Sequence, residues 1–496
     1  MPSARTIAKV LGVLAAATAG ALAVQEARKQ RDATLGGARG PISSSGRNAR
    51  TAAMAGLGAK AGGRYALHRA RKVFASAERQ SELDAAFELE TAESIAEALG
   101  NMKGAMMKLG QMASYLDQGM PEPVRDALAE LQMNAPPMSA ELAAQVVGEE
   151  LGGDPEEIFD TWDPRPIAAA SIGQVHRAIT KDGRAVAVKV QYPGVGDAIR
   201  SDLDNAGMLF GAMGMMLPGL EPGPLVEELR TRLVEELDYV KEADNQRLFA
   251  EYYAGHPFIH VPGVVDELCS ARVLTTELAE GVRFEEVERW SQEERDLAAE
   301  TIFRFVFGSL YRLHAFNGDP HPGNYLFKPG GQVTFLDFGL VKRFEPDEVD
   351  VIARMLKAMA VDKDIAEYRR IIESIGMLKA GAQFTDEEVM DYFGHFYDFV
   401  QRDEVNTITP EYASETVRRF FDYGGDHAEI LRSANIPPTF VIIQRINLGL
   451  YAIFGQLRAT ANWRRISEEI WPWIEAPPTT ELGRRAAAWA ADRGHA

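Results

Sequence analysis

The chain has 496 residues, a formal net charge of −19, 46% hydrophobic residues and 25% charged residues. This length allows two or three domains, and the acidic balance argues against nucleic acid as a general partner. The single cysteine, Cys269, excludes an intrachain disulfide bond and a cysteine metal cluster.

The amino-terminal end has the opposite charge to the rest of the chain. Residues 1–80 hold fourteen Lys and Arg against three Asp and Glu. Such a basic arm on an acidic body predicts contact with an anionic surface, for which anionic lipid is the simplest candidate. We expect residues 1–32 to form a membrane anchor or targeting helix and residues 33–80 to form a basic Gly/Ala-rich linker.

The anchor prediction depends on the apolar run Val10–Val24, which is shorter than the ~20 residues that a membrane span prefers. Arg28, Lys29 and Arg31 follow it and favour a catalytic body on the cytoplasmic side. A peripheral helix and a cleaved signal peptide are the alternatives.

Residues 81–165 are predicted to be a helical extension. From Ile95 to Leu116, apolar residues recur every three or four positions and form one seam that needs a partner surface. Lys108 and Gln111 lie on a second, polar stripe. On the residues alone, Lys108 is interpreted as a solvated helix lysine.

Residues 166–282 contain a pattern suited to nucleotide binding. Lys181-Asp-Gly183 predicts a hairpin, and the strand after it alternates, with Val186, Val188 and Val190 on one face and Ala187 and Lys189 on the other. Ala187 leaves room for a base, and Lys189 reaches phosphates. The loop before the hairpin stands where a kinase has its Gly-rich loop, but it carries Ala168, Ala169, Ala170, Ser171 and Gln174.

A kinase-type lysine needs a glutamate on a helix to orient it. The segment Leu225–Tyr252 is predicted to be helical and offers Glu235, Glu236 and Glu242. A strand from Val273 then leads through Glu277 into a hinge at residues 279–281.

The most specific chemistry lies between Asn317 and Gly339. Asp319 precedes Asn324 by five residues, the interval between the catalytic base and the metal-binding Asn of the kinase pattern H-R-D-x-x-x-x-N. Asp337 opens an Asp-Phe-Gly sequence. The residues between them predict two short strands around Pro329-Gly-Gly, which return Asp337 to the side of Asn324. These spacings predict that Asn324 and Asp337 hold Mg²⁺ and that Asp319 acts as the base.

Residues 283–470 otherwise have helical periodicity and are predicted to form a mostly helical lobe. The expected helices are at about 292–316, 346–360, 364–375, 386–401, 410–423 and 438–458. Residues 471–496 are expected to be a carboxy-terminal tail. His314 and His321 have no further ligands at metal spacing and are interpreted as structural.

Six motifs together resemble the UbiB/AarF atypical kinase family, which is associated with coenzyme Q. They are Lys108-Leu-Gly-Gln111, Ala168-Ala-Ala-Ser171-Ile-Gly-Gln174, Val186-Ala-Val-Lys189, Glu236-Leu-Asp238-Tyr-Val-Lys-Glu242, Asp319-Pro-His-Pro-Gly-Asn324 and Asp337-Phe-Gly. One departure is Asn317-Gly318, where many members have His-Ala, which affects how Asp319 is oriented.

The resemblance implies an α+β, protein-kinase-like two-lobed fold with an extra helical K-x-G-Q extension on the N-lobe. It implies that Lys108 and Gln111 cover the site and meet Glu236 and Asp238, and that Glu242 is the partner of Lys189. The implied nucleotide-binding residues are those of the alanine loop with Ala187, Lys189 and Glu277.

The predicted function is a membrane-associated atypical kinase or ATPase that uses ATP (or ADP) and Mg²⁺ and supports isoprenoid-quinone or related lipid metabolism. The expected partners are a membrane lipid or quinone precursor and an anionic membrane surface. The alternatives are a small-molecule phosphotransferase of the aminoglycoside/choline-kinase type and a nucleotide-binding scaffold without catalysis.

Overall fold

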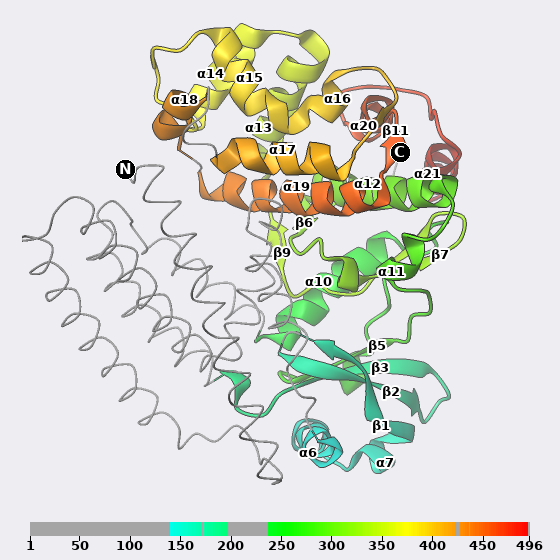
Figure 1. The fold of residues 1–496 in the computed structure, drawn as a ribbon. Helices are drawn as coiled ribbons and strands as arrows, with labels where there is room; N and C mark the ends of the chain where they lie inside the picture. Colours follow the sequence, from blue (N-terminus) through cyan, green and yellow to red (C-terminus); the bar gives the residue numbers. More distant parts are fainter. Residues whose placement is uncertain (1–138, 171, 197–236, 422–426, 436, 495–496) are drawn as a thin grey trace, which may run out of the picture. The chain divides into compact units, whose positions relative to one another are not determined.

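The computed structural model describes residues 139–170, 172–196, 237–421, 427–435 and 437–494 (Figure 1). The chain divides into two compact units. Unit 1 comprises Met1–Tyr239 with Leu268–Thr275, and unit 2 comprises Val240–Glu267 with Thr276–Ala496.

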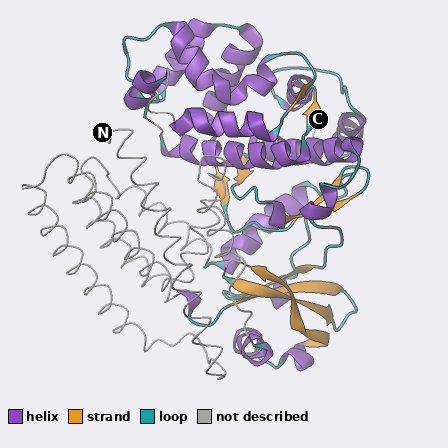
Figure 2. Ribbon diagram, viewed as in Figure 1, coloured by secondary structure: helices purple, strands orange, loops and turns teal. Residues whose placement is uncertain are grey.

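Unit 1 is built on a four-stranded sheet in the order β1-β2-β3-β5 (Figure 2). Its strands are β1 (Phe159–Ala170), β2 (Gly173–Thr180), β3 (Ala185–Gln191) and β5 (Val273–Glu277), the last of which continues into unit 2. Two helices precede the sheet, α6 (Ala140–Leu151) and α7 (Pro155–Ile158). Ser139 caps α6, and Gly152 ends it with a left-handed φ of 83°.

The predicted alternation on β3 is confirmed. Val186, Val188 and Val190 are fully buried, whereas Ala187 and Lys189 are half-buried on the other face. The turn between β2 and β3 is the predicted hairpin, in which Gly183 has a φ of 86°. A positive φ is what glycine tolerates better than any other residue.

Unit 2 contains two small sheets next to residues 317–324, which we call the Asp319 segment. One has the order β4-β8-β7, from β4 (Ile259–His260), β7 (Tyr325–Lys328) and β8 (Gln332–Phe335). The other pairs β6 (Ala315–Asn317) with β9 (Val341–Arg343). The hairpin of β7 and β8 around Gly330 and Gly331 confirms the strands predicted there.

Helices make up most of the rest of unit 2. They are α10 (Tyr239–Tyr252, which begins on the last residue of unit 1), α11 (Phe284–Val287), α12 (Gln292–Leu313), α13 (Pro346–Leu356), α14 (Ile365–Ser374), α15 (Asp386–Gly394), α16 (Asp398–Gln401), α17 (Pro410–Phe421), α18 (Ala428–Ser433), α19 (Pro438–Leu457), α20 (Trp463–Ile470) and α21 (Glu481–Asp492). The short 3-10 turns are η2 (Asp266–Leu268), whose last residue is assigned to unit 1, η3 (Pro322–Asn324) and η5 (His395–Tyr397). A π-helical turn, η4 (Lys357–Asp362), follows α13, and β10 (Asn406–Thr407) pairs with β11 (Thr460–Ala461).

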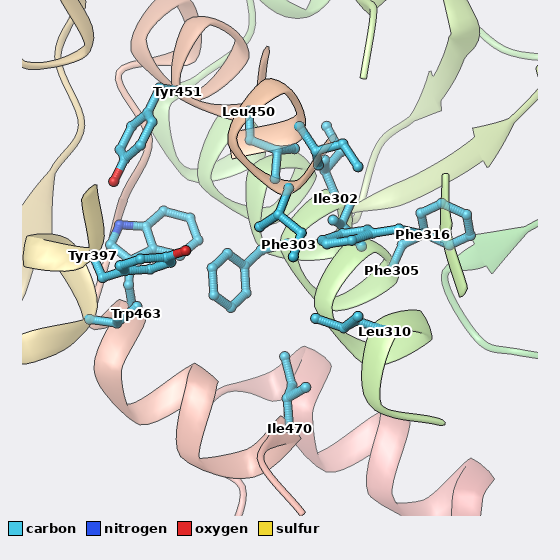
Figure 3. Packing of buried hydrophobic residues seen from close by; sticks show 14 of the residues in the cluster. Ile302, Phe303, Phe305, Leu310, Phe316, Tyr397, Leu450, Tyr451, Trp463 and Ile470 are labelled. Carbon is cyan, nitrogen blue, oxygen red and sulfur yellow. The ribbon is translucent and has the colours of Figure 1, made fainter. Parts of the chain in front are cut away.

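The core of unit 2 is rich in aromatic side chains that gather around α12. In Figure 3, Phe303 and Phe305 extend from this helix among residues of the surrounding helices. Phe305 stacks on Phe335 with ring centroids 3.6 Å apart, and Phe303 lies 5.3 Å from Trp463. Burial of such large side chains is the main stabilising contribution to this unit.

Several predicted boundaries are wrong. The helical region expected up to residue 165 gives way to β1 at Phe159, because these residues pair with β2. The predicted helix Leu225–Tyr252 is interrupted within its described part, since Leu237 and Asp238 are not helical. The helix expected up to residue 316 ends at Leu313, where His314 adopts a left-handed φ of 48°.

The segment expected as a tail, residues 471–496, belongs to the packed unit instead. Trp471 and Leu482 are buried in the core, and α21 forms within this segment. Over the residues that the structure describes, no helix has both the length and the apolar character needed to cross a membrane. The apolar run Val10–Val24 lies outside those residues.

Candidate functional site

The Asp319 segment begins where β6 ends. Asn317 is the last residue of this strand, and Asn324 ends the 3-10 turn that leads into β7. The Asp319 carbonyl accepts from the His321 N–H (2.7 Å), and the His321 carbonyl accepts from the Asn324 N–H (2.9 Å). Two consecutive tight turns therefore fold the five-residue interval onto itself and bring Asp319 and Asn324 together.

The side chains of Asp319 and Asn324 are in direct contact. The amide nitrogen of Asn324 donates to the carboxylate oxygen Oδ2 of Asp319 and to its main-chain carbonyl, both at 3.1 Å. With its NH₂ group used in this way, the Asn324 amide presents its oxygen as the atom that can coordinate a cation. Asp319 is buried, and together with burial its charge raises the pKa of the neighbouring Tyr325 hydroxyl.

Asn317 joins this segment to the Asp-Phe-Gly sequence. Its amide nitrogen donates to the Asp337 carbonyl (2.8 Å), and its amide oxygen accepts from the Asp319 N–H (3.2 Å). The next residue, Gly318, donates from its N–H to the Leu340 carbonyl (2.7 Å), and a Cβ there would lie 3.0 Å from the Leu340 side chain. The Asn-Gly pair therefore positions the main chain of Asp319 against that of Asp337.

The predicted return of Asp337 to the side of Asn324 is confirmed for the backbone. The Leu336 N–H donates to the Asn324 carbonyl at 2.9 Å, which extends the β7–β8 ladder by one bond. One carboxylate oxygen of Asp337, Oδ1, accepts from the Gly339 N–H at 2.9 Å. The main chain of Asp-Phe-Gly thus orients the carboxylate that begins it.

Helix α10 brings Glu242 to the same place. Glu242 is buried, with 2% of its surface exposed, and a Cβ on Gly339 would lie 3.5 Å from its Oε2. Unit 2 therefore gathers Asp319, Asn324, Asp337 and Glu242 around the Asp-Phe-Gly sequence. Among the described residues, no three His, Cys, Asp or Glu side chains form a metal cluster.

The possible metal ligands near Asp337 are few, and such a set suits Mg²⁺ better than a metal ion whose ligands all come from the protein. One carboxylate and one amide oxygen, from Asp337 and Asn324, are hard oxygen ligands. Mg²⁺ typically takes one or two such ligands, keeps several waters and completes its shell with substrate phosphates.

In unit 1, Lys189 of β3 lies beside Tyr239, the first residue of α10. Its ammonium lies 5.0 Å from the ring centroid of Tyr239, a cation–π distance, and Ala187 is on the same face of β3. Gly173 makes the close approach that this sheet needs, because a Cβ there would lie 2.2 Å from the Val190 carbonyl oxygen.

The alanine loop is shorter than expected. Ala168, Ala169 and Ala170 are strand residues of β1, paired with Val175, Gln174 and Gly173, so only the turn after Ala170 is a loop. Ser171 in this turn lies outside the described residues.

Gln174 is buried beside His176 and is not exposed. Its side chain is buried, with its Nε2 2.9 Å from Nε2 of His176. The other ring nitrogen of His176 lies 2.9 Å from the Asp163 carbonyl oxygen, and burial lowers the pKa of this histidine.

Other predicted residues have separate settings. Glu277 is exposed in unit 2, where its Oε2 lies 3.5 Å from the His260 ring. Asp238 is exposed at the boundary before α10. Lys108, Gln111 and Glu236 lie outside the described residues, so their pairing with Asp238 stays a prediction. The pairing of Lys189 with Glu242, which belong to different units, also stays a prediction.

Sequence reasoning missed Asn245. This residue is on α10, one turn after Glu242, and its amide donates to the Phe338 carbonyl at 3.1 Å. The available signal was its spacing from Glu242, since residues three apart share a helix face.

Comparison with known proteins agrees with these motifs. Residues 130–372 match the ABC1 atypical kinase-like domain. The chain is 36% identical over 272 residues to the atypical kinase COQ8B, mitochondrial, of Rattus norvegicus (54% of this chain, 51% of the relative). It is 32% identical over 255 residues to the atypical kinase COQ8, mitochondrial, of Saccharomyces cerevisiae (51% of each).

A solved structure is similar over a larger share of the chain. It is described as the complex of Rv3197 with erythromycin from Mycobacterium tuberculosis, with 32% identity and a TM-score of 0.58, covering 80% of this chain and all of that one. The chain spans about half the length, or less, of the first curated relatives that it matches. On these similarities and on the motifs assembled around Asp319, Asn324 and Asp337, the chain belongs to the UbiB/AarF family of ABC1 atypical kinases and has a kinase-like fold.

Proposed function

We propose that this chain is a Mg²⁺-dependent atypical kinase or ATPase whose phosphoryl acceptor is water or a lipid-related hydroxyl. The observation that carries the proposal is the set of contacts joining Asp319, Asn324 and Asp337 in unit 2. Phosphoryl transfer depends mainly on positioning and on neutralising phosphate charge, and this set contains a base and two cation ligands in the kinase order.

Each of these side chains would have a separate role. Asp319 would accept the proton of the attacking hydroxyl through its carboxylate. Asn324 would hold that carboxylate through its NH₂ group and would offer its amide oxygen, with a carboxylate oxygen of Asp337, to Mg²⁺. A bound Mg²⁺ would supply charge neutralisation at the phosphate oxygens. Lys189 would neutralise the phosphates from β3, and Ala187 would leave room for the base.

The membrane part of the proposal rests on the sequence and on the relatives. The basic residues 1–80 fit an anionic lipid surface, and the names of the COQ8 relatives place those proteins in mitochondria. We therefore include support of isoprenoid-quinone or related lipid metabolism, which the family resemblance implies, in the proposed function.

ATP turnover by the full chain tests this function. Turnover is measured under three conditions: without any addition, with anionic vesicles that contain a quinone-like phenol, and with hydrophilic alcohols. We expect the phenol-containing vesicles to raise turnover, and Asp319→Asn to abolish it. The control Asp492→Asn changes an exposed carboxylate on α21 and should have no effect.

Two results would contradict the proposal. Stimulation by hydrophilic alcohols alone would favour a small-molecule phosphotransferase. ATP binding without any turnover would favour a nucleotide-binding scaffold.

A further inference from the structure

One face of α10 is directed at the Asp-Phe-Gly sequence. Glu242, Asn245 and Phe249 are spaced three and four residues apart, which places them on the same side of a helix. Each contacts a different part of the sequence: Glu242 lies beside Gly339, Asn245 donates to the Phe338 carbonyl, and the Phe249 ring lies 5.0 Å from the Phe338 ring. Asn245 is 3% exposed, and both Phe rings are fully buried.

The main chain of this sequence lies between strands and needs partners from outside them. β8 ends at Phe335 and β9 begins at Val341, so Asp337 and Phe338 lie outside both strands. A carbonyl that is buried or partly buried outside a strand requires a donor from elsewhere. Two side-chain amides provide it, from Asn317 to Asp337 and from Asn245 to Phe338.

The two asparagines come from different elements. Asn317 ends β6, two residues before Asp319, whereas Asn245 belongs to α10, the helix that carries Glu242. The amide oxygen of Asn245 in turn accepts from the Arg343 guanidinium at 3.3 Å, which fixes the orientation of the amide. Successive carbonyls are therefore held from two sides, and we call this pair of side chains the amide clamp.

We propose that the amide clamp fixes the metal-binding conformation of Asp337, with Asn245 as the positioning residue that couples α10 to it. The physical reason is local. The Asp337 carboxylate accepts from the Gly339 N–H, so rotation of the Phe338 peptide would displace that donor and the carboxylate together. The proposal rests on the proposed function for its Mg²⁺ role, but not for its effect on the ligand-free backbone.

The simpler explanation is that Asn245 only satisfies a buried carbonyl and has no influence on Asp337. A matched control separates the two explanations. Gln246, the next residue on α10, is 1% exposed, and its amide donates to the Pro262 carbonyl at 2.7 Å. Gln246→Met thus removes a buried amide–carbonyl bond from the same helix without touching the Asp-Phe-Gly sequence.

The test variants are Asn245→Asp and Asn245→Leu. Asn245→Asp keeps the volume and the acceptor for Arg343 but removes the NH₂ donor, and Asn245→Leu removes both functions. If Asn245→Leu does not fold, Asn245→Asp still decides the question, because its charge is paired with Arg343.

The first measurement is hydrogen–deuterium exchange of the ligand-free full chain, read on the peptide covering residues 336–341. We expect both Asn245 variants to exchange about tenfold faster there, as loss of one buried hydrogen bond predicts, and Gln246→Met to be unchanged in that peptide. Unchanged exchange in folded Asn245→Asp, or equal acceleration in Gln246→Met, would overturn the clamp.

The second measurement is the Mg²⁺ concentration needed for half-maximal protection by ATP in a thermal-shift assay. Both Asn245 variants should need about tenfold more Mg²⁺, while Gln246→Met should need the wild-type amount. An unchanged Mg²⁺ midpoint in the Asn245 variants would refute the coupling to Asp337. If the wild type itself gains no Mg²⁺-dependent protection, the proposed function and the coupling both fail, and the exchange measurement still decides whether the clamp exists.

Discussion

The substitution Asn317→Leu tests how strongly the Asp319 segment is tied to the Asp-Phe-Gly sequence. Leucine has a similar volume but removes both hydrogen bonds of Asn317, at 2.8 Å to the Asp337 carbonyl and 3.2 Å from the Asp319 N–H. Asn317 is 7% exposed, so water cannot readily replace these partners. Leaving a buried polar group unpaired costs about 1–3 kcal/mol, so the two together predict a loss of about 2–6 kcal/mol in unfolding free energy.

Urea unfolding followed by tryptophan fluorescence measures this loss of unfolding free energy in unit 2, which contains Asn317. Five of the six tryptophans, all except Trp162, lie in unit 2. The control is Asn406→Leu, which removes one 3.3 Å bond to the Phe399 carbonyl from a half-buried side chain and should cost under about 1 kcal/mol. A change of less than about 0.5 kcal/mol in Asn317→Leu would refute the assigned role of Asn317.

Three further predictions concern other parts of the chain. Burial lowers the pKa of His256 from 6.5 to about 3 in the folded protein. As the pH falls below 6.5, the unfolded chain therefore binds a proton at this histidine while the folded chain does not. The part of the unfolding free energy that His256 contributes above pH 6.5 is lost as the pH falls toward 3. His256→Asn should flatten this loss in urea unfolding measured from pH 7 to 4, and equal slopes for the variant and the wild type would contradict the assignment. If Lys108 covers the site, Lys108→Ala should lower the melting temperature, because Glu236 and Asp238 lose their partner, and should raise autophosphorylation, because the site is opened; a variant unchanged in both measurements would show that Lys108 is a solvated lysine. Removal of residues 1–80 should release the protein from anionic liposomes in a flotation assay, and retention of the shortened chain would place the membrane surface on the body.

The parts of the site that the sequence predicted depend on local geometry. The hairpin of β7 and β8 follows from turn residues between two apolar runs, and a five-residue interval is short enough to bring Asp319 and Asn324 together. The alternating burial of β3 likewise follows from a period of two residues. For these elements, neighbours in the sequence are also neighbours in the structure.

The parts that it did not predict depend on contacts between distant residues. Asn245 and Phe338 are 93 positions apart, and a buried asparagine in a helix gives no local sign of its partner. The carboxy-terminal segment is a similar case, because its packing depends on Arg304 of α12, which is 7% exposed and pairs with Glu300 and Glu469. Arg304 also donates to Thr480, the residue that caps α21.

β1 shows tertiary pairing overriding local preference. Its first half includes three charged residues, Asp160, Asp163 and Arg165, and two prolines, Pro164 and Pro166, which favour a loop or a helix start over a strand. Its register with β2 shifts around Pro166, so the strand accommodates these residues through irregular pairing.

Mg²⁺-dependent protection by ATP tests the central claim most directly, because it requires Asn324 and Asp337 to act as one cation site. Melting of the full chain is measured with ATP and Mg²⁺ and with ATP and a chelator, in the wild type and in Asp337→Asn. At an ATP concentration about 100 times the Kd, the wild type should gain about 2.7 kcal/mol only when Mg²⁺ is present, and Asp337→Asn should lose that gain. Equal protection of Asp337→Asn and the wild type by Mg²⁺ and ATP would contradict the assignment of Asp337 as the metal ligand.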